Sequence, residues 1–497
     1  MNQVLEARLD MWKTSAVTAL FVTLLSVSTA AQDVRTVIED ASKAMGATGL
    51  NSITYSGAAA NGNFGQSRTI SFRLASTSIR NYTRTIDFTQ PASRASGDTL
   101  PPAIPGAPPP QPGTFNQTIT PATAAWAQQL QIWVTPWGFL RGASANNATV
   151  RSRKIEGVAY KVVTWTPVQK APSGHAYQVV GYINSQNMVD RVETWVEHPI
   201  FGDMHVETMY SNYQDFGGLK APTKIAQRQQ GMETFVAAIR EARANPPDLA
   251  QLMTAPPAGG GVAAAAGRGG ATDGSPAPAA VASEKLADGV YRITGGYVAL
   301  AVEFRDYVVV LEGGQNEARG LAIIAETRRV IPNKRIKYVV NTHPHFDHAG
   351  GLPPFAAEGI TILTDDNNKY FLDAALSSPR TLVGDALARS HKKPKVEGVI
   401  EKMVLKDDTR TIELHHVDKL EHSDGMLIAF LPKEKILFTA DFNVPAPGQA
   451  VSPSIATLVE NLERLQLDFD RHVMVHAPNP DRPMTKADLL ALARRTN

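Results

Sequence analysis

The chain of 497 residues contains no cysteine. This absence excludes disulfide bonds, thiolate ligands for a metal ion and a cysteine nucleophile. An excess of one charge is lacking as well, because 49 Lys and Arg face 47 Asp and Glu and leave a formal net charge of +2. With this balance of charges, the composition gives no support for binding to nucleic acid or to an anionic membrane surface.

A long apolar run is also missing from the N-terminal region. Arg8 and Lys13 precede an apolar stretch, residues 16–27, that is too short to span a bilayer comfortably. Small residues follow at 28–31, where a signal peptidase would cut. We therefore expect a signal peptide over residues 1–31 and an exported protein, periplasmic or secreted, without a stable membrane span after cleavage. The alternative is an N-terminal membrane anchor.

The length predicts two folded units, because single cores stop growing well below this size. Residues 246–284 are rich in Ala, Gly, Pro and Ser and could not bury enough apolar surface to fold. We interpret them as a linker between a β-rich accessory domain, residues 32–245, and a catalytic domain, residues 285–497. The partner that this organisation favours is a small-molecule substrate, and the oligomeric state stays open.

The accessory domain is predicted to be a curved antiparallel sheet packed on a helix. Apolar residues recur at helical spacing over 33–45, and strands follow, most clearly from Tyr160 to Arg228. The aromatic segment Trp126 to Phe139 is expected to pack a helix onto the sheet, with a ligand platform as the alternative. His175, His198 and His205 are scattered and are interpreted as surface or packing residues.

One motif of this domain resembles a known group of proteins. Residues 210–222 read Tyr-Ser-Asn-Tyr-Gln-Asp-Phe-Gly-Gly-Leu-Lys-Ala-Pro. This pattern is similar to the strand ends of lipoprotein-carrier-like domains of exported bacterial proteins. The resemblance implies an accessory role, either in binding apolar groups or as a spacer.

The catalytic domain alternates short apolar runs with helical patterns. Strands are expected at 289–294, 298–304, 307–312, 337–341, 360–363, 411–414, 426–431, 435–438 and 472–475, and helices at 316–331, 367–376 and 453–465. This order fits two β-sheets that face each other with helices outside, an α+β or α/β arrangement.

A histidine-rich loop follows the fourth of these strands. Within six residues, His343, His345, Asp347 and His348 offer three imidazoles and one carboxylate. Pro344 prevents the first two histidines from continuing a helix. Side chains that bind divalent metals therefore occupy a tight loop at a strand end, which predicts a metal site.

A site for two metals needs more ligands, and side chains at other strand ends can supply them. His422 precedes the strand at Met426, Asp441 follows the strand that ends near Phe438, and His476 follows the strand 472–475. His415 and His416 compete with His422 for the place of the third histidine. His391 and His472 are interpreted as non-ligands.

Over residues 285–497 the chain resembles the metallo-β-lactamase superfamily. The resemblance is carried by four motifs in this order: H-x-H-x-D-H, His-Ser-Asp, Phe-Thr-Ala-Asp and a strand-terminal His. The resemblance implies a four-layer αββα sandwich. It also implies that one metal is bound by His343, His345 and His422, the other by Asp347, His348 and His476, and that Asp441 bridges them. Val475 and Glu312 depart from the commoner Gly and Asp. Asp441 stands where true lactamases usually have Cys or Ser, which favours thioester, lactone and phosphodiester hydrolases.

The expected function is a metallo-hydrolase. Two divalent ions about 3.5–4 Å apart lower the pKa of a shared water to about 7, and the bridging hydroxide attacks an ester, thioester, lactone, lactam or phosphoester bond. Asp347 is expected to be catalytic, because it orients the nucleophile. Imidazole and carboxylate ligands favour Zn²⁺, although Fe and Mn are compatible. The alternatives are a β-lactamase proper and a non-catalytic metal-containing binding or sensory protein; a diiron flavoprotein-like redox role is disfavoured.

The sequence does not name the substrate. Selectivity is expected from residues 373–407, which include the basic run 389–395, and from the loop 443–452. The basic run could attract an acidic substrate, and a solvated loop is its alternative interpretation.

Overall fold

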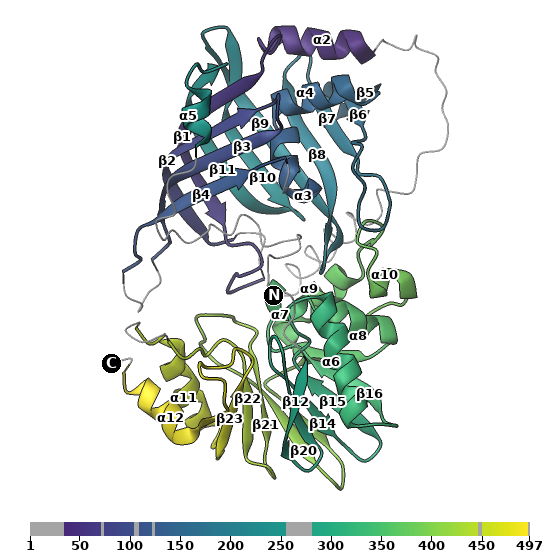
Figure 1. Ribbon diagram of the computed structural model, residues 1–497, viewed down its shortest axis with the longest axis vertical. Helices are drawn as coiled ribbons and strands as arrows, with labels where there is room; N and C mark the ends of the chain where they lie inside the picture. Colours follow the sequence, from purple (N-terminus) through teal and green to yellow (C-terminus); the bar gives the residue numbers. More distant parts are fainter. Residues whose placement is uncertain are drawn as a thin grey trace.

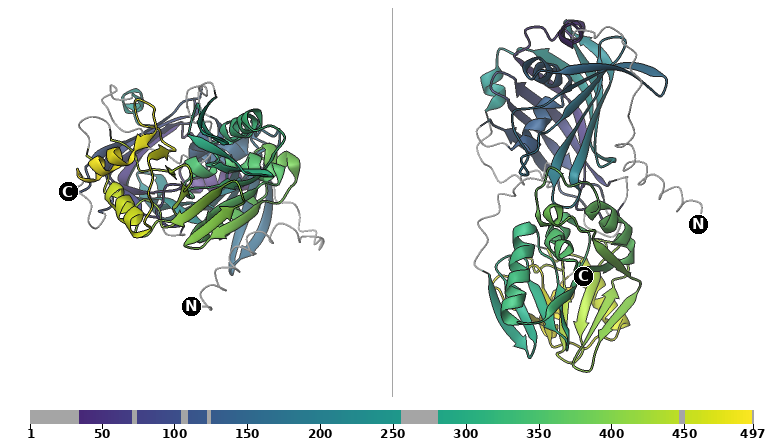
Figure 2. Two further views of the ribbon diagram at one scale, coloured as in Figure 1. Left: turned by 90° about the horizontal axis from the view of Figure 1, so that it is seen from below. Right: turned by 90° about the vertical axis from the view of Figure 1, so that its right-hand side faces the viewer.

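The computed structural model describes residues 34–70, 74–103, 109–121, 125–254, 281–445 and 450–495. They form two parts that lie end to end along the long axis of the molecule (Figures 1 and 2). The signal peptide expected over residues 1–31 lies outside the described residues. Within the described ranges, no helix is long and apolar enough to cross a membrane.

The N-terminal domain is built on one antiparallel sheet. Its eleven strands follow the spatial order β4-β3-β2-β1-β11-β10-β9-β8-β7-β6-β5, so the first strand pairs with the last. The large antiparallel sheet predicted from the sequence is confirmed. The strands are β1 (Ser52–Gly62), β2 (Ser76–Asp87), β3 (Ala92–Leu100), β4 (Gly113–Ile119), β5 (Thr149–Ile155), β6 (Val158–Trp165), β7 (Val179–Ile183), β8 (Val189–His198), β9 (Gly202–Phe216), β10 (Leu219–Gln229) and β11 (Met232–Ala244).

Helices α2 (Val34–Ala44), α3 (Trp126–Trp133) and α4 (Pro136–Ala145) lie together on this sheet. Helix α2 lies at one end of the domain and packs on α4, while α3 and α4 contact β8 (Figure 1). The side chain of Thr135 accepts a hydrogen bond from the Gly138 N–H and caps α4. The aromatic residues expected to pack a helix onto the sheet are buried, among them Trp126, Trp137 and Phe139.

The C-terminal domain contains two sheets that share a core. The first has the order β12-β13-β14-β15-β16-β17-β18 and the second the order β19-β20-β21-β22-β23-β24. Leu300, Val309 and Val340 of the first pack with Leu414 and Phe438 of the second in one buried cluster. The strands are β12 (Ala282–Ala287), β13 (Val290–Thr294), β14 (Ala299–Glu303), β15 (Tyr307–Leu311), β16 (Arg335–Val340), β17 (Thr361–Asp365), β18 (Lys395–Val399), β19 (Lys402–Lys406), β20 (Thr411–His416), β21 (Leu427–Leu431), β22 (Ile436–Thr439), β23 (Arg471–Met474) and β24 (Met484–Thr485).

Helices cover the other faces of these sheets. Val308, Val339 and Ile362, which alternate with the residues of the inner core, belong to a second buried cluster with Ile323, Phe355 and Leu372 from three helices. The helices α11 and α12 lie beside β23 (Figure 1). The helices of this domain are α6 (Glu317–Val330), α7 (Phe346–Ala349), α8 (Leu352–Glu358), α9 (Asp366–Leu376), α10 (Ala386–Ser390), α11 (Ser454–Arg464) and α12 (Lys486–Ala493).

Regular structure extends into both ends of the predicted linker, residues 246–284. Helix α5 (Leu249–Met253) contacts β2 and β3, and Arg94 Nη1 donates to the Leu252 carbonyl at 3.2 Å. At the other end β12 pairs with β13 from Ala282 onward. These elements were missed because contacts with neighbouring strands stabilise them, and the composition of a short segment does not report such contacts. Residues 255–280 lie outside the described residues, so a linker there stays a prediction.

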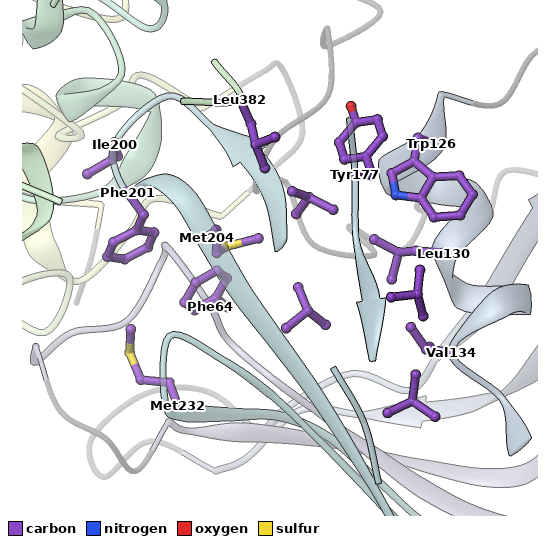
Figure 3. Close-up of a cluster of buried hydrophobic side chains, with 14 of the residues drawn as sticks. Phe64, Trp126, Leu130, Val134, Tyr177, Ile200, Phe201, Met204, Met232 and Leu382 are labelled. Atoms are coloured by element: carbon purple, nitrogen blue, oxygen red, sulfur yellow. The ribbon is translucent and has the colours of Figure 1, made fainter. Parts of the chain in front are cut away.

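The two domains share an interface that was not predicted. Phe64 and Phe201 of the N-terminal domain pack against Phe346 of the C-terminal domain, with ring centroids 5.0 and 5.6 Å away. The nearly buried Arg380 donates to the carbonyls of Pro199 and Ile200 at 2.6 and 3.0 Å. Figure 3 shows Leu382 of the C-terminal domain in one cluster with Ile200, Phe201, Met204 and Tyr177 of the other. The N-terminal domain is therefore packed against the C-terminal domain through both apolar and polar contacts.

The interface predicts a stability effect for Phe201 of the N-terminal domain. Phe201 is fully buried and contacts four aromatic rings, so Phe201→Ala should lower the free energy of unfolding by about 3–5 kcal/mol. Urea titration followed by fluorescence or circular dichroism measures the change. The control is Val168→Ala, at a side chain that is 89% exposed, where less than about 0.5 kcal/mol is expected. Equal stability of the two variants would contradict the burial of Phe201 at the domain interface.

Candidate metal centre

The loop after β16 has a fixed backbone. Asn341, which is fully buried, donates from Nδ2 to the His348 carbonyl and accepts from Thr364 Oγ1, both at 3.2 Å. The N–H groups of His348 and Ala349 donate to the His345 carbonyl at 2.9 Å and start the single turn of α7. The loop thus returns on itself directly after the buried strand. This turn brings all four predicted ligand residues to one edge of the sheet.

The remaining three predicted residues arrive from the other sheet. His422 lies before β21, Asp441 after β22 and His476 after β23. Asp441 adopts φ 62°, a left-handed conformation that Asp tolerates better than most residues. Since β22 and β23 are parallel, their carboxyl ends meet at the same edge.

The seven side chains form two groups. His343, His345, His422 and Asp441 offer ligand atoms within 4.8 Å of one another, and so do Asp347, His348 and His476. The structure thus brings together the side chains that the resemblance implied for each metal, with Asp441 in the first group, and their binding of metal stays a prediction.

Asp441 faces both groups with different oxygens. Its Oδ2 lies 2.7 Å from His422 Nε2 and 3.4 Å from His343 Nε2. Its Oδ1 lies 2.6 Å from His476 Nε2 and 3.0 Å from His348 Nε2. A carboxylate in this position can contribute one oxygen to each of two cations.

The donor set fits divalent cations. His343 Nε2 and His422 Nε2 lie 3.3 Å apart, as do His348 Nε2 and His476 Nε2, so the ring nitrogens of each group converge on a small volume. The buried Nδ1 of His345 has no hydrogen-bond partner among the described residues. A cation beside Nδ1 of His345 would give this atom a partner, and buried polar atoms are rarely left without one. Imidazoles and carboxylates of this kind are ligands of Zn²⁺ and related ions.

Burial disfavours the charged form of two histidines of the first group. It lowers the pKa of His343 to about 3 and that of His345 to about 2. Both imidazoles are therefore neutral near pH 7, which is the form that binds metals.

Glu312 controls the orientation of two histidines, a role that the sequence did not reveal. This fully buried carboxylate at the end of β15 accepts from His348 Nδ1 at 3.1 Å and from Thr342 Oγ1 at 2.9 Å. The Thr342 hydroxyl in turn can accept from His343 Nδ1 at 3.2 Å. Both rings thus present Nε2 to the centre. Burial opposes charge on His348, but Glu312 and Asp441 outweigh it and raise the pKa of His348 well above its usual value.

Tyr297 was missed altogether. Its hydroxyl donates to Asp347 Oδ2 at 2.8 Å, and its ring lies 4.4 Å from the His476 ring. Burial and the neighbouring Asp347 raise the pKa of Tyr297, so the hydroxyl stays a donor. The residue stands in the turn between β13 and β14, 50 residues before Asp347, and no local motif marks it.

The other histidines lie outside the two groups. His415 in β20 points to Glu413 at 3.0 Å, and His416 Nδ1 lies 2.6 Å from Asp365 Oδ2. His472 Nε2 contacts Thr439 Oγ1 at 2.8 Å, and His391 ends α10 with φ 53°. His422, rather than His415 or His416, is the residue that the fold places beside His343.

Residues 294–476 match the family model described as the Metallo-beta-lactamase superfamily. The C-terminal part of the chain is therefore a metallo-beta-lactamase superfamily domain. No curated protein matches the chain.

Similar solved structures cover less than half of the chain. One is a metallo-beta-lactamase from Pontibacter korlensis, 17% identical over 43% of this chain and 99% of that chain, with a TM-score of 0.34. Another is the metallo-beta-lactamase FIM-1 from Pseudomonas aeruginosa in its mono-zinc form, 15% identical over 44% and 94%, with a TM-score of 0.33. A third is a metallo-beta-lactamase from Hirschia baltica, 20% identical over 44% and 97%, with a TM-score of 0.33.

The role of Glu312 leads to a prediction on metal affinity. Glu312→Gln keeps the shape of the side chain but removes the charge that holds His348 and Thr342, so metal affinity should fall about 10–100-fold. Competition with a chromophoric chelator measures it. The matched control, Glu358→Gln, removes a carboxylate that pairs with Arg328 at the surface and should leave the affinity unchanged. Wild-type affinity in Glu312→Gln would contradict this account of the site.

Proposed function

We propose that the C-terminal domain is a hydrolase with two divalent metal ions, most suitably Zn²⁺. The observation that carries the proposal is the position of Asp441, whose two oxygens each face a separate group of histidines. The absence of thiolate ligands and the mixture of imidazole and carboxylate favour zinc, while Fe and Mn are compatible with the same set. The two facing sheets with helices on their other faces support the four-layer αββα arrangement.

When bound, such ions lower the pKa of a shared water to about 7 and polarise a carbonyl or phosphoryl oxygen. The chain itself provides orientation. Asp347 is held at both oxygens, by the Gln66 amide at 2.5 Å and by the Tyr297 hydroxyl at 2.8 Å. A carboxylate fixed in this way can accept a hydrogen bond from an attacking water and keep that water on one line of approach.

The side open to solvent is defined by two of the histidines. The side chains of His422 and His476 are 29% and 26% exposed, whereas those of His343 and His348 are fully buried. A substrate would therefore approach between His422 and His476. Asp441 replaces the Cys or Ser of true lactamases, which supports an ester, thioester, lactone or phosphoester as the substrate rather than a lactam.

The N-terminal domain is proposed to be lipoprotein-carrier-like, as the segment 210–222 suggests. The curved eleven-stranded sheet with α3 and α4 on it supports this proposal (Figure 1). Its role would be to bind apolar groups or to act as a spacer. The apolar stretch at residues 16–27 supports export to the periplasm or beyond.

Metal removal tests the proposed hydrolase directly. The purified protein should contain two metal ions per chain by mass spectrometry and should hydrolyse at least one of a set of lactam, lactone, thioester and phosphodiester probes. Dialysis against a chelator should abolish turnover, and Zn²⁺ should restore it. Two bound metals without turnover on any probe would favour a non-catalytic binding or sensory protein instead.

Asp347 is the residue whose conservative replacement should affect the chemical step. Asp347→Asn keeps the size of the side chain but loses its charge, and kcat should fall about 10²–10⁴-fold. The matched control is Asp306→Asn, at an exposed position of the turn between β14 and β15, where kcat should not change. Steady-state kinetics on the best probe measures both. A kcat within twofold of wild type for Asp347→Asn would remove Asp347 from the mechanism.

A further inference from the structure

We propose that the N-terminal domain completes the metal centre. The segment Asn63 to Arg68 follows β1, and we name it the inserted loop. It contacts two segments that carry metal-ligand candidates, the turn with His345 and Asp347 and the loop of His422. This inference rests on the proposed function, because it assigns a positioning role toward the same two ions. No sequence motif marks the inserted loop, and the loop lies outside residues 294–476, which match the family model.

The first residues of the inserted loop pack against α7. The Phe346 N–H donates to the Gly65 carbonyl at 3.0 Å, and the buried Phe64 ring packs edge-on against Phe346. Gly65 adopts φ +83°, and a Cβ there would lie 2.2 Å from Phe346 Cδ2. Only glycine allows this close approach, so the loop meets the metal-binding turn with a defined register.

The backbone of the inserted loop fixes the proton of His345. His345 Nε2 lies 3.2 Å from the Ser67 carbonyl oxygen. A carbonyl can only accept, so Nε2 must carry the proton and Nδ1 must hold the free lone pair. That Nδ1 is the buried atom without a hydrogen-bond partner among the described residues. The N-terminal domain therefore selects the tautomer in which His345 can bind a cation.

The side chain of Gln66 orients the second group. Its Nε2 donates to Asp347 Oδ1 at 2.5 Å, across 281 positions of the sequence. The other oxygen of Asp347, Oδ2, lies 3.8 Å from His348 Nε2 and so faces the ring of the second group. The amide of Gln66 thus restrains rotation of the carboxylate and favours its charged form, since it donates to an anion.

Arg68 contacts the loop of the third histidine. The Arg68 carbonyl accepts from the Asp424 N–H at 2.9 Å, and Arg68 Nε lies 2.6 Å from Asp424 Oδ1, two residues after His422. The two side chains are 52% and 39% exposed, so the ion pair contributes little and the backbone hydrogen bond carries the contact. Loss of the Arg68 side chain should therefore matter less than loss of Gln66 or displacement of the backbone.

The test uses the full-length protein and two variants of the inserted loop. In Gln66→Ala, competition with a chelator should show an affinity for one of the two Zn²⁺ ions about 10-fold below that of wild type. In Gly65→Val, the added side chain should displace the loop from Phe346 and lower the affinity for both Zn²⁺ ions about 10–100-fold. The absorption spectrum of the Co²⁺-loaded protein should change as well. The matched control is Gln90→Ala, an exposed residue of the same domain, where both affinities should equal wild type.

The outcomes separate the inference from the proposed function. Variants that bind two Zn²⁺ ions as tightly as wild type and give the wild-type Co²⁺ spectrum would overturn the role of the inserted loop and leave the hydrolase intact. A wild-type protein that binds no metal would overturn both. Circular dichroism reports whether Gly65→Val still folds; if it does not, Gln66→Ala decides, because it shortens one partly exposed side chain.

Discussion

The charge of Asp441 is the constraint on which the C-terminal domain depends. One buried carboxylate lies between four imidazole nitrogens, two near each oxygen. The two nitrogens near each oxygen also lie 3.3 Å from each other, so each group is gathered in a small volume. In the proposed function, two divalent cations would bind between these imidazoles and Asp441. The positive φ angles of Asp441 and Glu312, both at strand ends, are strain of the kind found at functional sites.

The fold delivers these groups because strand ends are rigid and loops are short. β16 ends directly before Asn341, β22 before Asp441 and β23 before His476, and the two sheets share a buried apolar core that sets their spacing. The histidines are then oriented by groups behind them, Glu312 and Thr342 from the same domain and Ser67 from the other. The centre therefore depends on both domains, which agrees with the buried aromatic interface between them.

Most strands and all seven candidate ligands could be predicted from local sequence patterns. The elements and residues that were missed share one cause. Apolar runs such as 307–312 and the H-x-H-x-D-H loop are contiguous signals, so the main strands and the candidate ligands were recognisable. The edge strand β18, which begins at Lys395, and helix α5 lack such runs and depend on neighbours. Tyr297, Gln66 and the role of Glu312 depend on contacts across 30 to 281 positions. No single sequence displays those contacts before the chain has folded.

Anomalous diffraction from crystals of the full-length protein grown with Zn²⁺ tests the central claim most directly. Data collected above and below the zinc edge should give two peaks about 3.5–4 Å apart. One peak should lie beside His343, His345 and His422, the other beside Asp347, His348 and His476, with one oxygen of Asp441 directed at each. A single peak remote from Asp441, or none at these side chains, would contradict the account.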